Sequence, residues 1–173
     1  MIDLISFIDI SATLCKVVPL SKKELLAFDA TVTSIIIPNY SCYDHNYTIF
    51  DFSRFSLVES IDIGNDCLKS VQTFKIDGLN RLKTIKIGDD SFTQNDNIYD
   101  SGLDESKSFH ILNCESLESI EIGVFSFNDF AGEFELKNLP QLQSIQIGAI
   151  GSDSYNFWYS SFVIRGIELI LII

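Results

Sequence analysis

The segment Phe109–Gly123 reads FHILNCESLESIEIG, and this fifteen-residue pattern decides the fold because the chain repeats it. The common form is F-x-[apolar]-x-x-x-x-x-L-x-[ST]-I-x-I-G, and a fifth copy begins at Phe162. A partial earlier copy spans Val32–Pro38. Self-similarity of this kind predicts a solenoid of stacked coils. The four complete copies are Phe50–Gly64, Phe74–Gly88, Phe109–Gly123 and Phe134–Gly148.

The spacing of the copies gives the length of one coil. Successive first phenylalanines lie 24, 35, 25 and 28 residues apart, so the basic period is near 24 or 25 residues. All insertions fall between the glycine of one copy and the phenylalanine of the next. We therefore expect these segments to form loops on one side of the solenoid.

Each copy contains two segments in which apolar and polar residues alternate, F-x-[IFL] and [ST]-I-x-I-G. Alternation with period two predicts half-buried strands. Between them, apolar residues such as Leu79, Leu82 and Ile85 are three apart, which favours an inward-pointing turn because the segment is too short for an independent helix. The expected fold is a predominantly β repeat solenoid with two short parallel sheets and little helix.

Three inward rows of side chains should form the core of this solenoid. The first row is predicted to contain Phe50, Phe74, Phe109, Phe134 and Phe162. The second is predicted to contain Ile61, Ile63, Ile85, Ile87, Ile120, Ile122, Ile145 and Ile147. The third, four residues after each glycine, is predicted to contain Leu68, Phe92 and Phe127.

The outward positions of the predicted strands alternate in charge from coil to coil. Opposite charges on neighbouring strands contribute a few tenths of a kcal/mol per pair, and they support the alignment. One outward row is Asp51, Lys75, His110 and Glu135. The other is Asp62, Lys86, Glu121 and Gln146.

Composition excludes several classes of protein. Of the 173 residues 46% are hydrophobic, which argues against disorder. The net charge of −12 argues against nucleic acid and against an anionic membrane surface. No apolar run is long enough to span a membrane. The four cysteines form no CxxC pair, so we interpret them as free thiols; they are Cys15, Cys42, Cys67 and Cys114.

The segment Leu139–Gly148 resembles the L-x-x-L-x-x-L-x-L core of leucine-rich repeats, and Ile87–Phe92 and Ile122–Phe127 resemble the I-x-x-x-x-F stretch of the BspA-like subclass. The resemblance covers Val32–Ile173, with glycine where many leucine-rich repeats carry a ladder asparagine. It implies a solenoid whose concave sheet binds other proteins. BspA-like members are often surface adhesins.

The two ends of the chain depart from the repeat. Residues 1–31 are expected to form an N-terminal cap or leader, with a short helix over Lys22–Phe28 opened by a capping box at Ser21. A degenerate repeat is the alternative. Asp3 and Asp9 interrupt the N-terminal apolar run, so a clear signal peptide is lacking, which favours a cytoplasmic location. The solenoid, residues 32–173, ends in mid-repeat.

The unfinished last copy leads to two hypotheses. The chain is either a fragment of a longer array or associates with itself through its apolar C-terminal end, Ile170–Ile173. A non-functional fragment of a repeat family is a further alternative. Reading the genomic frame beyond Ile173 for more copies distinguishes these cases.

No catalytic motif, metal site or cofactor is predicted. The sequence lacks GxSxG, GxGxxG and Walker patterns. His45 lacks a second ligand pair, and His110 is expected on the surface. The acidic segment Asp89–Lys107 is expected to be a solvated loop, with Ca²⁺ binding as the alternative.

The function expected is a non-catalytic protein-interaction or structural module. The runner-up is a parallel β-helix enzyme that acts on polysaccharide, although Lys86 separates the two acids Asp62 and Glu121. A further alternative is that the outward residues only keep the sheet soluble. The predicted partner-binding residues are Ser60, Asp62, Thr84, Lys86, Ser119, Glu121, Ser144 and Gln146.

Overall fold

The protein is a β-solenoid made of two parallel five-stranded sheets. The structure is a computed structural model, and it describes residues 32–41, 45, 48–53, 55–94, 104–151 and 153–167. Within these residues there is no helix. The predicted fold class is therefore confirmed, whereas the expected helix Lys22–Phe28 and the apolar end Ile170–Ile173 lie outside the described residues.

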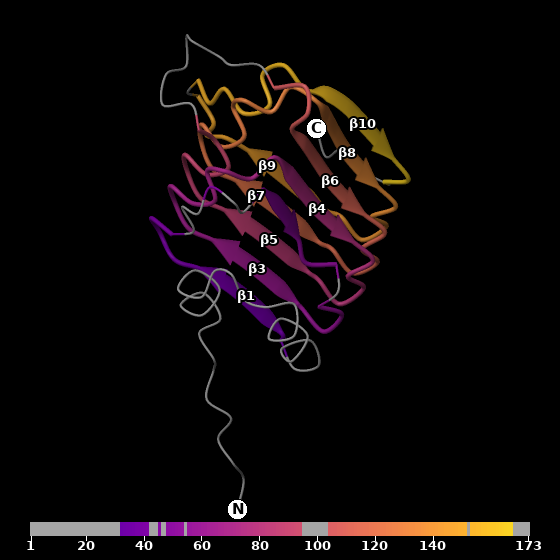
Figure 1. The fold of residues 1–173 in the computed structure, drawn as a ribbon. Coiled ribbons are helices and arrows are strands. Elements are labelled where there is room, and N and C mark those ends of the chain that lie inside the picture. Colours follow the sequence, from indigo (N-terminus) through magenta and orange to yellow (C-terminus); the bar gives the residue numbers. More distant parts are fainter. Residues whose placement is uncertain are drawn as a thin grey trace, which may run out of the picture.

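The chain alternates between the two sheets as it winds, one strand of each per coil (Figure 1). Sheet A has the order β1-β3-β5-β7-β9, and sheet B has the order β10-β8-β6-β4-β2. The strands of sheet A are β1 (Ser34–Ile37), β3 (Ser60–Ile63), β5 (Thr84–Ile87), β7 (Ser119–Ile122) and β9 (Ser144–Ile147). The strands of sheet B are β2 (Ile49–Asp51), β4 (Thr73–Asp77), β6 (Ser108–Leu112), β8 (Glu133–Lys137) and β10 (Ser161–Arg165).

The first predicted row of phenylalanines is a continuous stack on the inner face of sheet B. Strand register pairs Phe50 with Phe74, Phe74 with Phe109, and Phe109 with Phe134. Their ring centroids are 4.9, 4.6 and 4.9 Å apart and the rings are within 7° of parallel. Phe162 is paired with Phe134 but its ring is tilted by 40° and 55% exposed, because β10 is an edge strand.

The isoleucine row on sheet A follows the predicted register through all four copies. Its members on β3, β5 and β7 are buried. Ile145 is only partly buried and Ile147 is 36% exposed. The prediction that this row is uniformly part of the core is thus wrong at β9, an edge strand of sheet A that no further described coil covers.

The third row packs against the first and is one residue longer than predicted. Phe92 and Phe127 stack at 4.6 Å, and Phe127 and Phe157 stack at 4.9 Å. Phe92 also meets Phe74 edge-on, with centroids 5.4 Å apart and an interplanar angle of 83°. Edge-to-face and offset pairs add about 0.5–1.5 kcal/mol beyond burial. The two rows therefore interlock across the middle of the solenoid.

The residues of the third row have left-handed backbone conformations. Leu68, Phe92, Phe127 and Phe157 have φ between 50° and 59°. Left-handed geometry costs roughly 1–2 kcal/mol for a residue with a β-carbon. Burial of each large apolar side chain contributes about 1.5–3 kcal/mol, which offsets the cost.

The predicted turns between the two strands of a copy are also confirmed. Leu79 and Leu82 are buried, as are Leu139 and Leu142. In each turn the second leucine donates its N–H to the carbonyl of the first, at 3.1 and 3.2 Å. The three-residue spacing is thus that of a tight inward turn.

A ladder of polar side chains joins the coils just after sheet A. Asn39 Oδ1 accepts from the N–H of Asn65 at 2.8 Å, and Asn65 Oδ1 accepts from the N–H of Asp89 at 3.0 Å. Asp89 Oδ1 in turn accepts from the N–H of Val124 at 2.8 Å. Asn65 and Asp89 each follow a repeat glycine, and Asn39 follows Pro38 at the same place in the partial copy. Gly88 is required because a β-carbon there would meet Asn65 Oδ1 and lie 2.7 Å from Asn65 N.

Replacing Gly88 with alanine is expected to lower the free energy of unfolding by about 1–3 kcal/mol, since the added methyl group forces the ladder of Asn65 apart. Urea unfolding followed by circular dichroism measures the change. The control is Gly78→Asn, which should leave the free energy of unfolding unchanged. Nothing lies within 4 Å of a β-carbon built at Gly78, and the equivalent residues Asn113 and Asn138 also have a positive φ. Equal stability of Gly88→Ala and the wild type would contradict the ladder.

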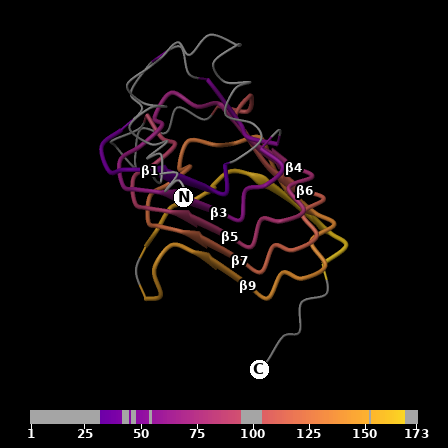
Figure 2. The ribbon, with the colours of Figure 1, turned by 90° about the horizontal axis from the view of Figure 1, so that it is seen from below.

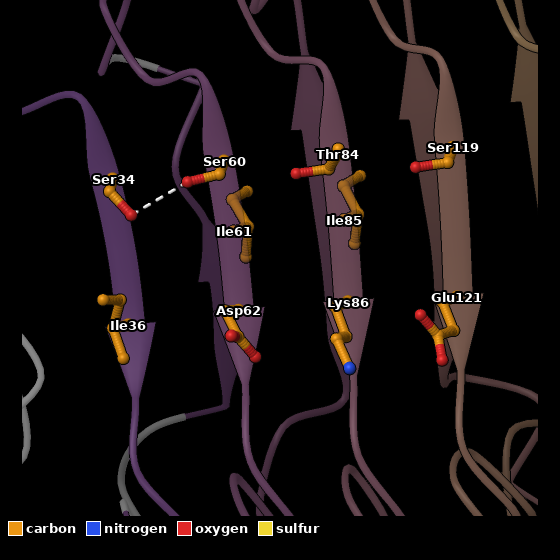
Figure 3. A pocket seen from close by; sticks show the side chains of 10 residues that line it. All are labelled: Ser34, Ile36, Ser60, Ile61, Asp62, Thr84, Ile85, Lys86, Ser119 and Glu121. Atoms are coloured by element: carbon orange, nitrogen blue, oxygen red, sulfur yellow. Dashed lines mark hydrogen bonds between the residues drawn. The ribbon is translucent and has the colours of Figure 1, made fainter.

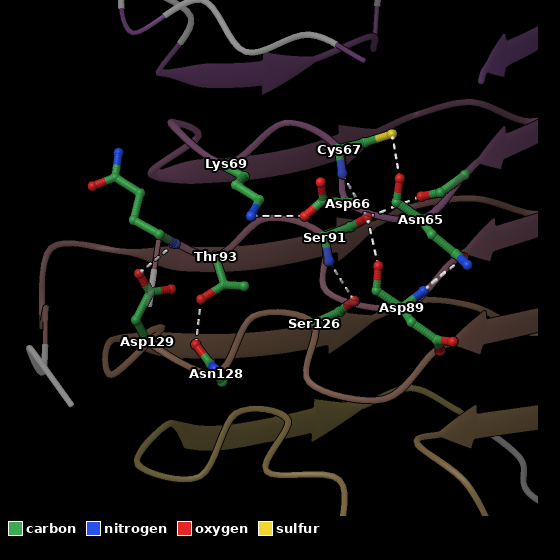
Figure 4. A network of polar contacts seen from close by, with 12 residues as sticks. Asn65, Asp66, Cys67, Lys69, Asp89, Ser91, Thr93, Ser126, Asn128 and Asp129 are labelled. Atoms are coloured by element: carbon green, nitrogen blue, oxygen red, sulfur yellow. Dashed lines mark hydrogen bonds and ion pairs between the residues drawn. The ribbon is translucent and has the colours of Figure 1, made fainter. Parts of the chain in front are cut away.

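A second, buried ladder runs parallel to the first (Figure 4). Ser91 Oγ accepts from the N–H of Cys67 at 3.1 Å and donates to the carbonyl of Gly64 at 2.9 Å. In the next coil Ser126 Oγ accepts from the N–H of Ser91 at 2.9 Å and donates to the carbonyl of Gly88 at 2.7 Å. Each serine therefore satisfies one donor and one acceptor of the preceding coil, which buried backbone requires.

Candidate binding face on sheet A

The eight predicted partner-binding residues lie on one surface, the outer face of sheet A. Register places them in two parallel rows that cross β3, β5, β7 and β9. Figure 2 shows these strands side by side as one series. The row of hydroxyls contains Ser60, Thr84, Ser119 and Ser144. The row of longer side chains contains Asp62, Lys86, Glu121 and Gln146.

An open groove of about 440 Å³ follows this face (Figure 3). Six of the eight predicted residues line it, and Ser144 and Gln146 on β9 do not. Ser34 and Ile36 of β1 line it as well, and Ser34 Oγ lies 2.9 Å from Ser60 Oγ. The prediction omitted β1, although the partial copy Val32–Pro38 carries its serine at the same place in the pattern.

The charges of the groove alternate as predicted, but they do not pair with one another. Asp62, Lys86 and Glu121 are adjacent in register and are all exposed. No salt bridge within 4.0 Å joins any of the three to another described residue. The three groups are therefore available to a ligand from solution.

The groove offers hydroxyl groups and charged side chains to a ligand. Its ten lining residues include neither histidine nor cysteine. Its two carboxylates, Asp62 and Glu121, stand on β3 and β7 with Lys86 of β5 between them.

The outer face of sheet B carries the other predicted row, with the expected register from Asp51 through Lys75 and His110 to Glu135. His110 Nδ1 lies 3.5 Å from Glu135 Oε2. Lys75 forms its ion pair with Asp77 on its own strand, at 3.7 Å. The neighbouring-strand contact is thus present for His110 and Glu135.

Two of the four cysteines are described, and both are buried free thiols, as predicted. Burial raises the pKa of the Cys67 thiol, and it raises the pKa of Cys114 to about 11. Both therefore stay protonated at neutral pH and are poor nucleophiles. Cys67 Sγ donates to the carbonyl of Pro38 at 3.1 Å. The thiol thus makes the contact with the preceding coil that the hydroxyls of Ser91 and Ser126 make in the next two coils. Cys15 and Cys42 lie outside the described residues.

The acidic insertion is described only at its two ends, because residues 95–103 lie outside the described part. Asp89 belongs to the polar ladder. Asp104 Oδ1 accepts from Ser106 N at 2.9 Å and from its hydroxyl at 2.5 Å, and the hydroxyl bond lowers the pKa of Asp104. Asp89 thus binds the backbone of the next coil, and Asp104 binds the backbone of its own loop. Binding of Ca²⁺ by the loop stays an open alternative.

The ends of this insertion are tied to the next coil by a buried ion pair. Lys107 Nζ lies 2.6 Å from Asp129 Oδ2, and their side chains are 5% and 6% exposed. The N–H of Gln94 donates to the same oxygen at 3.3 Å. Sequence reasoning placed Lys107 in a solvated loop. Nothing in the repeat pattern marked Asp129 as its partner.

Neither a protein-family model nor a curated protein nor a solved structure matches the chain. Among the described residues, no helix is long and apolar enough to cross a membrane.

Proposed function

We propose that the chain is a non-catalytic protein-interaction module of the leucine-rich-repeat type, and that it binds its partner on the outer face of sheet A. The observation that carries this proposal is the groove of about 440 Å³ across β1, β3, β5 and β7. Its three charged groups form no ion pair with another described residue. A partner that supplies the opposite charges gains interactions without first breaking internal ones.

Three features support the leucine-rich-repeat assignment. The L-x-x-L segments form inward turns, with Leu79 and Leu82 buried. One strand per coil contributes to a parallel sheet with an open groove. A ladder of hydrogen-bonded side chains, Asn39, Asn65 and Asp89, joins the coils close to the place that the ladder asparagine has in leucine-rich repeats.

The chemistry of the face defines the kind of partner. One row presents hydroxyl groups, and the other presents acid, base and acid in adjacent strands. Hydrogen-bond donors and alternating charges fit a polar protein surface, and electrostatic complementarity sets specificity and association rate. The net charge of −12 favours a basic partner.

Charge reversal on the groove tests this proposal. Lys86→Glu and Glu121→Lys are each used as bait in affinity capture beside the wild type, with circular dichroism to check folding. A partner that depends on the groove is expected to bind each variant at least tenfold more weakly in subsequent calorimetry, since mispaired charges at an interface cost several kcal/mol. The dependence on these charges is expected to weaken at high salt.

The matched control is Lys137→Glu, a change of the same charge at an exposed position on β8 of sheet B. The proposal requires this variant to bind the partner like the wild type. If every captured protein binds all three variants equally, or is lost equally from Lys137→Glu, the face of sheet A is not the binding surface.

A further inference from the structure

The outer face of sheet B brings together three metal-ligating side chains that lie in two different coils. His110 is on β6, and Glu133 and Glu135 are on β8. Register places His110 directly opposite Glu135. Glu133 precedes Glu135 by two residues, so it is on the same face of the strand. One ligand atom from each of the three lies within 4.8 Å of the others.

We propose that His110, Glu133 and Glu135 bind a divalent transition-metal ion, with Zn²⁺ as the best match. Imidazole and carboxylate are ligands of zinc, at about 2.0–2.2 Å, and zinc sites with three protein ligands keep a fourth position for water. Hard cations such as Ca²⁺ select oxygen-only sets, so the imidazole distinguishes this site from a calcium site. The two carboxylates balance the charge of the ion.

The backbone that carries these ligands is fixed by the core. Phe109 and Phe134, the neighbours of His110 and Glu135, are buried and stacked at 4.9 Å. The side chains of His110 and Glu135 are each only 19% exposed and already lie 3.5 Å apart at Nδ1 and Oε2. Little ordering therefore remains for these two ligands when the ion binds. A carboxylate oxygen of the exposed Glu133 already lies within 4.8 Å of the ligand atoms of both.

Two lysines stand near the cluster: Lys75 is next to His110 in register, and Lys137 stands two residues after Glu135 on the same face of β8. Lys75 is the residue opposite His110 on β4, and its ammonium group is 3.7 Å from the carboxylate of Asp77. On the other side, β10 places the uncharged Val163 opposite Glu135. A bound ion would join β6 to β8, and thus one coil to the next, so metal binding should also stabilise the fold.

Calorimetric titration of the full chain with ZnCl₂ in a non-chelating buffer tests the site. The expected result is binding to the wild type, a higher melting temperature with Zn²⁺, and d–d absorption bands when Co²⁺ replaces Zn²⁺. Glu135→Gln and His110→Ala are expected to weaken binding by more than tenfold, since removal of even an outer-shell partner costs 10–100-fold. Glu133→Gln, which changes only an exposed side chain, is expected to weaken it as well.

The matched control is His45→Ala, because His45 is the other histidine of the chain and is exposed. It should bind Zn²⁺ like the wild type. The proposal is overturned if the wild type binds no Zn²⁺, if His110→Ala, Glu133→Gln and Glu135→Gln all bind it undiminished, or if His45→Ala loses it equally. Because the groove is on sheet A, the outcome is independent of the proposed function.

Discussion

Replacing Phe109 with alanine is expected to lower the free energy of unfolding by about 3–5 kcal/mol. Phe109 is stacked between Phe74 and Phe134, at 4.6 and 4.9 Å, and meets Phe127 and Phe157 edge-on at 5.1 and 5.2 Å. Its removal leaves a cavity where the two aromatic rows interlock. Because the coils that carry Phe74 and Phe134 pack against the two faces of this ring, the stack does not close over the cavity. Equilibrium unfolding in urea measures the loss.

The control for Phe109→Ala is the same change at Phe162, which belongs to the same row. The ring of Phe162 is 55% exposed and contacts Phe134 at an angle of 40°. Its loss should cost about 1 kcal/mol, since much of its surface is already in water. If the two variants were equally destabilised, the inward stacking of Phe109 would not be the source of its contribution.

Replacing Lys107 with methionine is expected to have an effect of similar size, about 3–5 kcal/mol at neutral pH. The change leaves the carboxylate of Asp129 buried without its counter-ion, and the remaining donor to Oδ2 is the N–H of Gln94 at 3.3 Å. The other oxygen, Oδ1, is buried and has no hydrogen-bond partner among the described residues. The ammonium group also lies 5.6 Å from the ring of Phe130, and this contact is lost too.

Adding Asp129→Asn to Lys107→Met distinguishes the cost of the unpaired carboxylate from the loss of packing by the lysine side chain. The amide carries no charge, so the double variant should be more stable than Lys107→Met alone. A double-mutant cycle gives the coupling, which is expected to be about 0.5–3 kcal/mol for residues in contact. Additive losses within error would mean that the ion pair contributes nothing and that Lys107 acts through its hydrocarbon chain.

The periodic part of the fold could be predicted closely. The rows of Phe74 and Phe109 and of Ile85 and Ile120 follow from spacing alone, because a strand that alternates with period two has only one way to bury its apolar face. The outward row follows as well, which is why the repeat spacing assigns Lys86 to its correct neighbours on the adjacent strands.

Core residues that depart from the repeat spacing could not be predicted from the sequence. Phe157 was missed because an insertion separates it from Gly148, although Asn156-Phe157 stands where earlier coils have Ser126-Phe127. Asn156 also takes over part of the serine's role, since its Nδ2 donates to the carbonyl of Gly123 at 2.7 Å. The sequence feature that marks Phe157 is this dipeptide, in which asparagine replaces serine, and the repeat spacing alone does not reveal it.

By itself, the sequence determined the coil, the two parallel sheets and the burial of the periodic apolar side chains except on the edge strands β9 and β10, because burial of a repeated apolar residue requires only that each copy do the same. The tertiary structure decided which polar groups meet. Lys107 reaches Asp129 because the path of the insertion ends beside the next coil. The repeat register had already predicted that His110 lies beside Glu135, and only the structure adds Glu133 to this pair. The repeat that opens the sequence therefore specifies a framework, and the contacts between its coils supply the ion pair and the candidate sites.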